Sequence, residues 1–555
     1  MELVIISLII GLFGTIGAKF YIKNKKHPEG LFHLFFAEMW ERFSFYGMRA
    51  LLVLYIIKDY MKSVENNEDI AYGIYAAYGA LVYATPLLGG FLADKFIGYR
   101  KAVIWGGILM ALGHFFMAIP TDFFFYGALA MLIAGNGFFK PNISSLVGSL
   151  YKKNDIKRDS GFTIFYMGIN LGAAVAPILC GYLGNKFGWH YGFGLAGLGM
   201  LAGIIVFWDG IQKGVFKNEG LQPKKYQKEK WGLGLIWVKI KDKWEPLING
   251  SKVEMTIYLL SFLAAPIFAL FIVLEASGSS FLGKMLLILG AAVLVYLLYL
   301  IIKMYFQNNT AASGKLASVV ILASLCTVFW ACFEQAGSSI VVWVDKCCNL
   351  GFFEDASQTN FINPGYIIFL AIPFSIMWSK LDYIKRNPST ALKFAMGLAF
   401  LGLGFLTFAY SINYIDGAGK IPISFLFVGW LIITTGELFL SPIGLSKITE
   451  LSPKHMVGFI MGVWFLSSTF AHYIAGALAK LTTSSSETNI DNESKYTMLD
   501  KLNEMIFKVD MSLPGVQEAM IYNDLFGKIG FVTIGIALIT LIISPVIKKL
   551  MHDVH

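Results

Sequence analysis

The sequence predicts an all-α protein that crosses a membrane many times. The chain has 555 residues, of which 56% are hydrophobic and only 15% are charged. A soluble domain carries about 25% charged residues, so this chain is too apolar to cover a surface that faces water. Apolar stretches of about 18 residues or more recur from end to end, and each can cross ~30 Å of hydrocarbon as a helix. The composition therefore excludes a soluble globular enzyme, a disordered chain and a disulfide scaffold.

The hydropathy pattern predicts fourteen spans after residue 30. They lie near residues 31–57, 71–94, 102–119, 123–150, 161–184, 191–210, 254–274, 282–302, 316–345, 360–379, 394–412, 421–446, 456–479 and 529–547. Six come before the lysine-rich stretch 211–252, two follow it, and six come after residue 315. This arrangement is typical of a secondary transporter with paired halves. The expected parts are a leader at 1–26, a six-helix bundle at 27–210, a cytoplasmic linker with two inserted helices at 211–315, and a second six-helix bundle at 316–555 with an external insert at 480–528.

Residues 1–21 form a further apolar stretch at the N-terminus, preceded by Glu2 and followed by Lys23, Lys25 and Lys26. A cleavable signal peptide carries its positive charges before the apolar core, not after it. We therefore expect an extra span with its N-terminus outside. An unstructured leader is the alternative.

The net charge of +9 reflects topology and not a nucleic-acid site. Predicted loops on one side of the membrane hold 30 of the 45 Lys and Arg residues. By the positive-inside rule, this side is the cytoplasm, so residues 211–252 and the C-terminal Lys548–Lys549 pair lie there. The pattern indicates a multi-pass protein of the cell membrane, in contact with its lipids.

Two polar stretches between the spans carry local signals. Within the linker, WGLGLIWVKIKDKW is amphipathic and is expected to lie on the membrane surface. In the external insert, KLNEMIFKVD predicts a short helix.

Several motifs associated with enzymes are decoys or are missing. The pattern GxGxxG at residues 192–197 lies inside an apolar span, where small residues serve helix packing. Residues 278–285 nearly spell a phosphate-binding loop but lack its Ser or Thr. The five cysteines show no metal-ligand spacing, and no HExxH or GxSxG motif occurs. We expect no enzyme activity, no cofactor and no metal.

The informative residues are charges inside the first span after residue 30, FFAEMWERFSFYGMRALLVLY. A charge at mid-helix costs roughly 2.5–3.5 kcal/mol unless it is paired or hydrated. At 100° per residue one face of this helix carries Glu38, Glu41, Arg42, Tyr46 and Arg49. The face either lines a cavity or forms a purely structural seam of ion pairs. Four charges are more than helix assembly needs, which favours the cavity.

Other spans supply ionisable partners. Lys140 and Glu437 each have a proline close behind them, where broken backbone can line a site, and Glu334 lies in VFWACFEQAGSS. Together these side chains predict a cavity with both signs of charge, suited to a zwitterion with an amine and a carboxylate. His114 and His472 lie on mostly apolar spans and are predicted to be packed rather than to carry protons. The cytoplasmic turn GGFLADKFIGYRKA is expected to control the inward gate or the topology.

At this point the residues resemble a known family. Residues 38–47, EMWERFSFYG, resemble the ExxERFxYYG motif of the proton-dependent oligopeptide transporters (the POT or PTR family) of the major facilitator superfamily. Residues 165–172, FYMGINLG, match the family's FYxxINxG motif. The segments GNGFFKPN, FEQAGSS, FINPG, GELFLSP and MGVWFL are also similar to family segments. The resemblance covers about residues 27–480 and the last helix, and it implies the major-facilitator fold, with two six-helix bundles and an inserted hairpin.

The resemblance implies a symporter that imports di- and tripeptides with protons by alternating access. Proton coupling would fall to Glu38, Glu41 and Arg42. The peptide carboxylate would meet Arg42 and Lys140, and the peptide amine and backbone would meet Asn170, Asn363 and Glu437. Side-chain pockets would be lined by Tyr46, Tyr83 and Trp464. The outer gate would be closed by Arg49 with Glu334, and the inner gate by Lys140 with Glu437.

The sequence also departs from the family pattern. Phe45 replaces a common tyrosine, which removes a hydroxyl from the predicted site. The leader and the external insert are longer than is typical. Animal members use a histidine of the second helix for protons, whereas the second span here has none, so coupling would depend on carboxylates. Another major-facilitator transporter coupled to protons, for drugs or organic ions, is the alternative function; peptide preference, proton stoichiometry and oligomeric state stay open.

Overall fold

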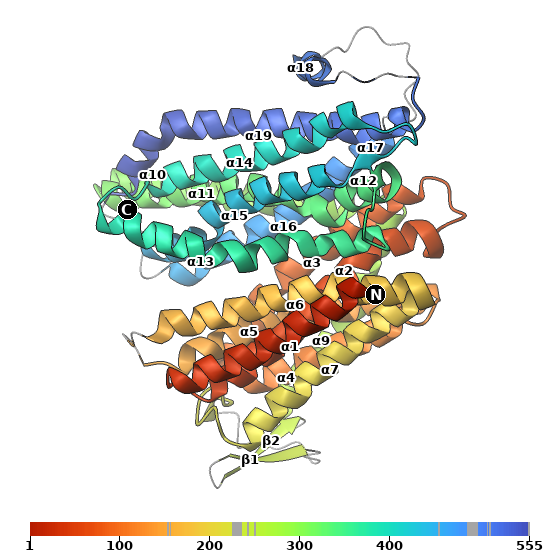
Figure 1. Ribbon diagram of the computed structural model, residues 1–555. Coiled ribbons are helices and arrows are strands. Elements are labelled where there is room, and N and C mark those ends of the chain that lie inside the picture. Colours follow the sequence, from red (N-terminus) through yellow and green to blue (C-terminus); the bar gives the residue numbers. More distant parts are fainter. Residues whose placement is uncertain are drawn as a thin grey trace. The chain divides into compact units, whose positions relative to one another are not determined.

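The structure is a computed structural model, shown in Figure 1. It describes residues 1–152, 155, 157–224, 236–240, 243–248, 251–452, 456–484, 498–507, 509 and 512–552.

Each predicted span is helical over most of its length, and a 3₁₀ turn at Glu334–Gly337 divides the span at 316–345 into two helices. The long helices are α1 (Glu2–Asn24), α2 (Gly30–Tyr55), α3 (Asn67–Leu92), α4 (Tyr99–Met117), α5 (Asp122–Ser149), α6 (Lys157–Phe187), α7 (Trp189–Gln212), α9 (Lys252–Ala276), α10 (Phe281–Phe306), α11 (Thr310–Phe333), α13 (Ile362–Tyr383), α14 (Thr390–Tyr410), α15 (Ser424–Leu451), α16 (Val457–Ala479) and α19 (Val516–Leu550). Shorter elements are α12 (Ser339–Cys347), α17 (Leu481–Ser484), α18 (Met498–Ile506), β1 (Ile236–Ile240), β2 (Lys243–Ile248), β3 (Cys348–Asn349) and β4 (Ile421–Pro422). In the described parts of the chain, eleven helices are apolar and long enough to cross a membrane.

The leader forms a helix, α1, as expected, and not an unstructured segment. It lies against α6, where Gly11 faces Val175 and Gly14 faces Leu171. A Cβ atom at Gly14 would come within 2.6 Å of the Leu171 side chain, so the missing side chain lets the helices approach. Most of the other side chains of α1 are exposed and apolar, as suits a surface that faces lipid.

Glycines bring other helices of the same bundle together. In α4 and α5, a Cβ at Gly106 would lie 2.5 Å from the carbonyl oxygen of Gly135, and one at Gly135 would lie 2.6 Å from that of Gly106. The GxGxxG decoy behaves in the same way, because a Cβ at Gly192 would lie 2.7 Å from the Cys180 carbonyl oxygen. Its glycines lie within α7, so the packing interpretation is confirmed.

The chain divides into two compact units. Unit 1 comprises Met1–Tyr60, Leu81–Val273 and Ser357–Gly365, and unit 2 comprises Met61–Ala80, Leu274–Ala356 and Tyr366–His555. The division differs from the bundle boundaries expected from the sequence, because packing assigns the first half of α3 to unit 2 and nearly all of α9 to unit 1. The bundle boundaries expected from the sequence therefore stay a prediction.

The described linker residues 236–240 and 243–248 form an antiparallel hairpin in which Val238 pairs with Glu245 and Ile240 with Lys243 (Figure 1). The other residues of the predicted amphipathic segment lie outside the described part of the chain, and its location on the membrane surface stays a prediction. The residues of β1, IWVKI, alternate apolar and polar only in part, and such a short run cannot by itself distinguish a strand from a helix. In the external insert, the short helix predicted from KLNEMIFKVD is present as α18.

Buried charges anchor the linker and α9 to the N-terminal end of α4. The Lys101 ammonium lies 2.7 Å from a carboxylate oxygen of Glu254 and donates to the Gln222 side chain at 3.1 Å. The Arg100 guanidinium donates to the carbonyl oxygens of Lys217 and Glu219, both at 2.7 Å. The charged turn at this end of α4 thus holds the linker in place, and its predicted role in the inward gate or the topology stays a prediction.

A second contact ties α6 to the turn between α1 and α2. The two ring nitrogens of His27 lie 2.9 Å from the Tyr151 hydroxyl and 3.1 Å from the Ser160 hydroxyl. Burial, together with nearby Lys157, lowers the pKa of the His27 imidazole. Burial also raises the pKa of Tyr151 to about 12. Both groups are therefore neutral near pH 7, and the contact carries no charge.

Candidate functional site

The centre of the candidate site is the charged face of α2, which the structure buries in unit 1. Glu38, Glu41 and Arg42 are 2%, 0% and 2% exposed, and Arg49 is also buried. The helix continues through this face without a break. Charged residues this deep in a membrane helix must be paired or bound to a ligand, because hydrocarbon does not solvate them.

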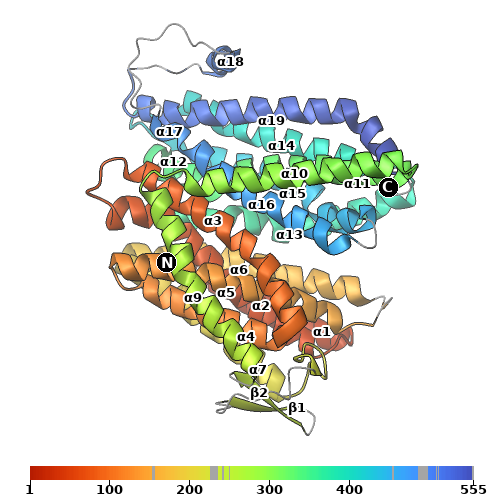
Figure 2. The same ribbon diagram turned by 180° about the vertical axis from the view of Figure 1, so that it is seen from behind.

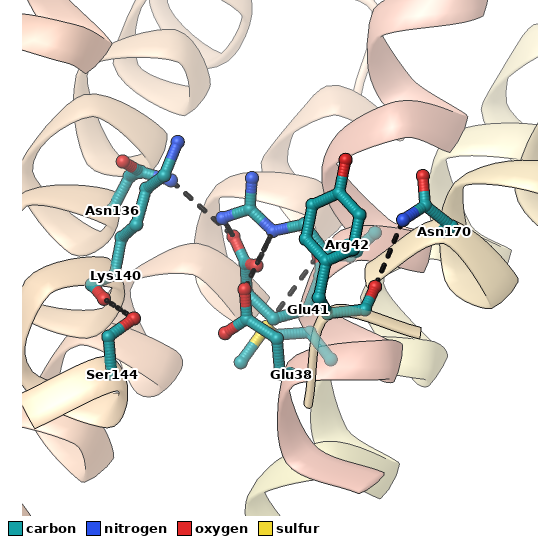
Figure 3. Close-up of polar contacts among 10 residues, drawn as sticks. Glu38, Glu41, Arg42, Asn136, Lys140, Ser144 and Asn170 are labelled. Atoms are coloured by element: carbon teal, nitrogen blue, oxygen red, sulfur yellow. Dashed lines mark hydrogen bonds and ion pairs between the residues drawn. The ribbon is translucent and has the colours of Figure 1, made fainter. Parts of the chain in front are cut away.

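Arg42 joins the two carboxylates of this helix (Figure 3). Its Nε atom lies 3.3 Å from Glu38 Oε1, and both Nε and Nη2 donate to Glu41, the latter at 2.7 Å. The second oxygen of Glu38 is buried and has no hydrogen-bond partner among the described residues. The guanidinium thus holds Glu41 with two hydrogen bonds and Glu38 with one longer contact, so Glu38 is the carboxylate with a free position for a proton.

Helix α5 adds an amide and an ammonium to this face (Figure 3). Asn136 donates to Glu41 Oε1 at 3.4 Å. One turn further on, the Lys140 ammonium lies 4.3 Å from the centre of the Tyr83 ring. The structure therefore brings Glu38, Glu41, Arg42 and Lys140 together with Tyr83 of α3. Asn136 also belongs to this group, and the sequence analysis did not predict it.

The aromatic residues beside the site lie on the same helix as the charges. The Arg42 guanidinium lies 5.3 Å from the Phe45 ring centre, and the Arg49 guanidinium lies 5.6 Å from that of Tyr46. Cations over aromatic faces gain about 0.5–2 kcal/mol. Phe45, which departs from the family pattern, thus keeps a contact with Arg42 that needs only a ring and no hydroxyl.

Two asparagines predicted to bind substrate are also in unit 1. Asn170 is buried and donates to the Tyr166 carbonyl oxygen of its own helix at 3.0 Å (Figure 3). Its helix lies close to α2 because a Cβ at Gly172 would be only 2.1 Å from the Met39 carbonyl oxygen. Asn363, at the start of α13, is half-buried.

Unit 2 holds a second group of polar side chains, around Glu334. Helix α11 ends at Phe333, and Glu334 begins a single 3₁₀ turn before α12. The Tyr75 hydroxyl donates to Glu334 Oε2 at 3.3 Å, and His472 Nδ1 lies 3.6 Å from the same oxygen. Sequence reasoning placed Glu334 in a site but missed Tyr75, and it predicted His472 to be a packed histidine. Both lie on apolar helices far from Glu334 in sequence, and only the fold brings them together.

The remaining predicted residues also lie in unit 2. Glu437 is buried on α15, and Trp464 is half-buried on α16. Each predicted gate joins a residue of unit 1 to a residue of unit 2, Arg49 with Glu334 and Lys140 with Glu437. These two gates stay predictions.

Within the described residues, no cluster of three or more His, Cys, Asp or Glu side chains could hold a metal ion. The five cysteines are buried and none is in a disulfide.

His114 is fully buried, and neither of its ring nitrogens has a hydrogen-bond partner in the described structure. It fits the packed role predicted from its apolar helix.

Membrane-crossing helices that bury opposite charges in their interior define a class of protein, the polytopic secondary transporters. The family model described as the POT family matches residues 100–499. The chain therefore belongs to the POT family.

Relatives agree with this assignment. The chain is 34% identical over 541 residues to an uncharacterised transporter of Bacillus subtilis, YclF, covering 95% of this chain and 96% of the relative. It is 32% identical to the di-/tripeptide transporter of Lactococcus lactis subsp. cremoris, with 83% and 91% covered. It is 34% identical to the peptide transporter YePEPT of Yersinia enterocolitica, with 81% and 87% covered.

Solved structures show the same fold. A crystal structure of a POT peptide transporter with bound sulfate matches with a TM-score of 0.71 at 32% identity, covering 95% of this chain and 96% of the other. A mutant POT transporter with bound alafosfalin matches with a TM-score of 0.70 at 32% identity over the same shares. The predicted fold class, the major-facilitator fold, is thereby confirmed.

Proposed function

We propose that this protein is a proton-coupled symporter that imports di- and tripeptides by alternating access. The observation that carries the proposal is the buried cluster of Glu38, Glu41 and Arg42, with Lys140 of α5 beside the same face. Relatives in the family are named di-/tripeptide and peptide transporters, and a related structure holds a conjugated peptide. Peptides fit this chemistry because each carries one carboxylate and one ammonium.

The peptide carboxylate binds to Arg42 and Lys140, the two cations of unit 1 that lie nearest the carboxylates of α2. The peptide amine and backbone bind to Asn170, Asn363 and Glu437. Side chains of the peptide occupy pockets lined by Tyr46, Tyr83 and Trp464, whose rings accept apolar and polar groups alike.

Proton coupling follows from the competition for Arg42. While the guanidinium holds both carboxylates, neither needs a proton. When a peptide carboxylate draws Arg42 away, Glu38 or Glu41 is left buried with a negative charge that the membrane interior does not solvate, and it takes up a proton. One partner exchange thus links proton binding to substrate binding.

Alternating access needs two gates. Arg49 with Glu334 closes the outer side, and Lys140 with Glu437 closes the inner side. Because Lys140 and Glu437 also meet the substrate, peptide binding and closure of the inner gate compete for the same charges. The protein acts in the cell membrane, with its C-terminus in the cytoplasm because Lys548 and Lys549 follow the last span.

Uptake of labelled dialanine into proteoliposomes with an imposed pH gradient tests the proposal. One proton driven by 100 mV supplies about 2.3 kcal/mol, enough for a roughly 50-fold peptide gradient. We expect accumulation that a protonophore abolishes. Accumulation that is unchanged by the protonophore contradicts proton coupling, and transport of drugs or organic ions without peptide competition supports the alternative function.

A second test examines the two peptide termini. Blocking either one leaves a buried charge of the site without its partner, which costs about 3 kcal/mol or ~10²-fold in affinity. N-acetylated dialanine and dialanine amide should therefore compete poorly with labelled dialanine. Equal competition by the blocked and free peptides rejects binding through both termini.

A further inference from the structure

The polar group around Glu334 in unit 2 has a geometry that its predicted role in a gate does not explain. Glu334, His472 and Tyr75 are 3%, 6% and 3% exposed. The Tyr75 hydroxyl at 3.3 Å and the His472 Nδ1 atom at 3.6 Å both approach Glu334 Oε2. A fixed donor and a titratable imidazole thus reach one oxygen of a buried carboxylate.

The surrounding backbone makes space for this arrangement. Gly79 on α3 has no side chain, and a Cβ there would lie 3.1 Å from the Cβ and Cγ atoms of His472. A Cβ at Gly337 would lie 2.2 Å from the Tyr75 hydroxyl. The Gln335 amide donates at 2.9 Å to the carbonyl oxygen of Ala475, one turn beyond His472 on α16. The 3₁₀ turn that carries Glu334 is therefore fixed against both of the helices that supply its partners.

Other ionisable groups of these helices are paired elsewhere. In α3, Glu68 binds Lys346 and Asp69 binds Lys480, the latter at 3.0 Å. In α16, the hydroxyl of Tyr473 donates to Glu275 at 3.3 Å. Glu437 lies on the neighbouring helix α15, and Arg49, in unit 1, is the gate partner proposed above. His472 is thus a titratable cation that unit 2 places against Glu334.

We propose that His472 is a positioning residue for Glu334 and that the two side chains share one transported proton while the outer gate is open. The inference rests on the proposed function. When Arg49 leaves Glu334, a bare carboxylate would remain in the protein interior, at a cost of several kcal/mol. The pair takes up a single proton instead, held either on Nδ1 as an ion pair or on Oε2 as a carboxyl group, and Tyr75 keeps its hydrogen bond in both forms. The proton leaves when Arg49 returns.

The imidazole extends the pH range over which this proton is held. An unperturbed imidazole binds its proton about two pH units above a carboxylate. Without His472, Glu334 has to take the proton alone, which requires more acidic conditions. The two groups titrate as a coupled pair, so the expected signature is a shift of the whole transport profile and not a loss of transport.

The experiment compares dialanine accumulation with peptide counterflow at external pH values between about 5 and 8. His472→Asn keeps a nitrogen near the position of Nδ1 but cannot titrate. Thr469→Val, one turn earlier on the same helix, is the matched control, because Thr469 is buried and its hydroxyl has no hydrogen-bond partner among the described residues. We expect His472→Asn to keep counterflow within about twofold and to move half-maximal accumulation about one pH unit towards acid. Thr469→Val should match the wild type.

A double variant tests whether His472 acts through Glu334. Glu334→Gln should lose proton-driven accumulation, and adding His472→Asn should change nothing further. The proposal is overturned if the pH profile of His472→Asn superimposes on that of Thr469→Val. It is also overturned if His472→Asn still alters counterflow when Glu334 is already Gln.

A measurement without transport separates this inference from the proposed function. The ring signals of His472 in ¹⁵N-histidine spectra of the full-length protein, assigned with His472→Asn, should titrate at lower pH in Glu334→Gln, because a neighbouring negative charge is lost. An unchanged midpoint overturns the pairing, even if the wild type transports peptide. If the wild type accumulates no dialanine, the proposed function fails, and this titration still decides whether His472 and Glu334 share a proton.

Discussion

Helices α2 and α10 have the same length, 26 residues, and opposite surroundings. In α2, 21 residues are buried, including both carboxylates and both arginines, whereas α10 buries only Leu282, Gly283, Leu286 and Leu297. Figure 2 shows helix α10 in green, in front of the other helices of unit 2. Its Leu287, Ile288 and Val295 side chains are exposed. The helix with the clearest membrane signal thus has few interactions with the protein. The helix whose charges weaken that signal forms the candidate site.

The contrast has an energetic reason. A side chain that faces lipid needs only to be apolar, and many residues satisfy that condition. A buried charge needs a particular partner at a particular distance, so its replacement leaves another charge unsatisfied. Substitutions should therefore have large and specific effects in α2 and small effects in α10.

The largest effect is expected for Arg42→Ala. It leaves Glu38 and Glu41 buried without the guanidinium, at a cost of about 3–5 kcal/mol, and it removes a cation for the peptide carboxylate. Dialanine accumulation and counterflow should both fall by at least ~10²-fold. Arg42→Lys, which keeps the charge but not the two-pronged geometry, should recover only part of either activity. Normal counterflow in Arg42→Ala would remove this residue from the substrate site.

The next effect separates proton coupling from substrate binding. Glu38→Gln and Glu41→Gln keep the shape of the side chain but cannot exchange a proton, so each should abolish proton-driven accumulation while some counterflow remains. Glu41→Gln should lower counterflow more, because Glu41 makes the two close hydrogen bonds to Arg42. If both variants concentrate peptide as the wild type does, α2 is not the coupling element and Glu334 becomes the leading candidate.

A buried ion pair outside the site should affect stability rather than coupling. Lys101→Met leaves Glu254 buried without its ammonium partner and should lower the free energy of unfolding in detergent by about 3–5 kcal/mol. The double variant Lys101→Met/Glu254→Leu removes both charges and should recover most of that loss. A double variant as unstable as the single one would show that the two residues stabilise the linker independently.

The smallest effect is expected on α10. Ile288 is 72% exposed, so Ile288→Ala removes contacts with lipid and almost none with protein. Transport and the unfolding temperature should both stay within the scatter of the wild type, as for most surface substitutions. A clear loss of transport in Ile288→Ala would show that the outer face of α10 has a partner, and the contrast with α2 would no longer hold.

The sequence was sufficient to predict the elements that follow from a simple and repeated physical requirement. Runs of apolar residues predicted the spans, and the 100° spacing of charges predicted that Glu38, Glu41 and Arg42 share a face, as the structure confirms. The lysine content predicted which part of the chain is the linker. It did not predict the hairpin of the described linker residues, because a run of five residues does not determine whether the backbone is helical or extended.

Contacts between residues that are far apart in the chain could not be predicted from the sequence. Asn136 reaches Glu41 only because glycines bring α4 and α5 together and the bundle then places α5 beside α2. Within its own helix, His472 has the sequence neighbours of a core residue. Its contact with a carboxylate depends on the 3₁₀ turn that carries Glu334. Neither contact leaves a local signal in spacing or composition, because helix packing, not periodicity, determines it.

Helices α3, α9 and α13 each begin in one unit and end in the other, so three of the five passages of the chain between the units lie within continuous helices. Each has an interior proline about two turns from the crossing: Pro86, Pro266 and Pro373. A proline lacks the N–H that would bond to the carbonyl four residues earlier, and its ring displaces that carbonyl, so a helix bends there at the lowest cost. In each of the three helices, the position where a bend costs least therefore lies near the point at which the chain passes from one unit to the other.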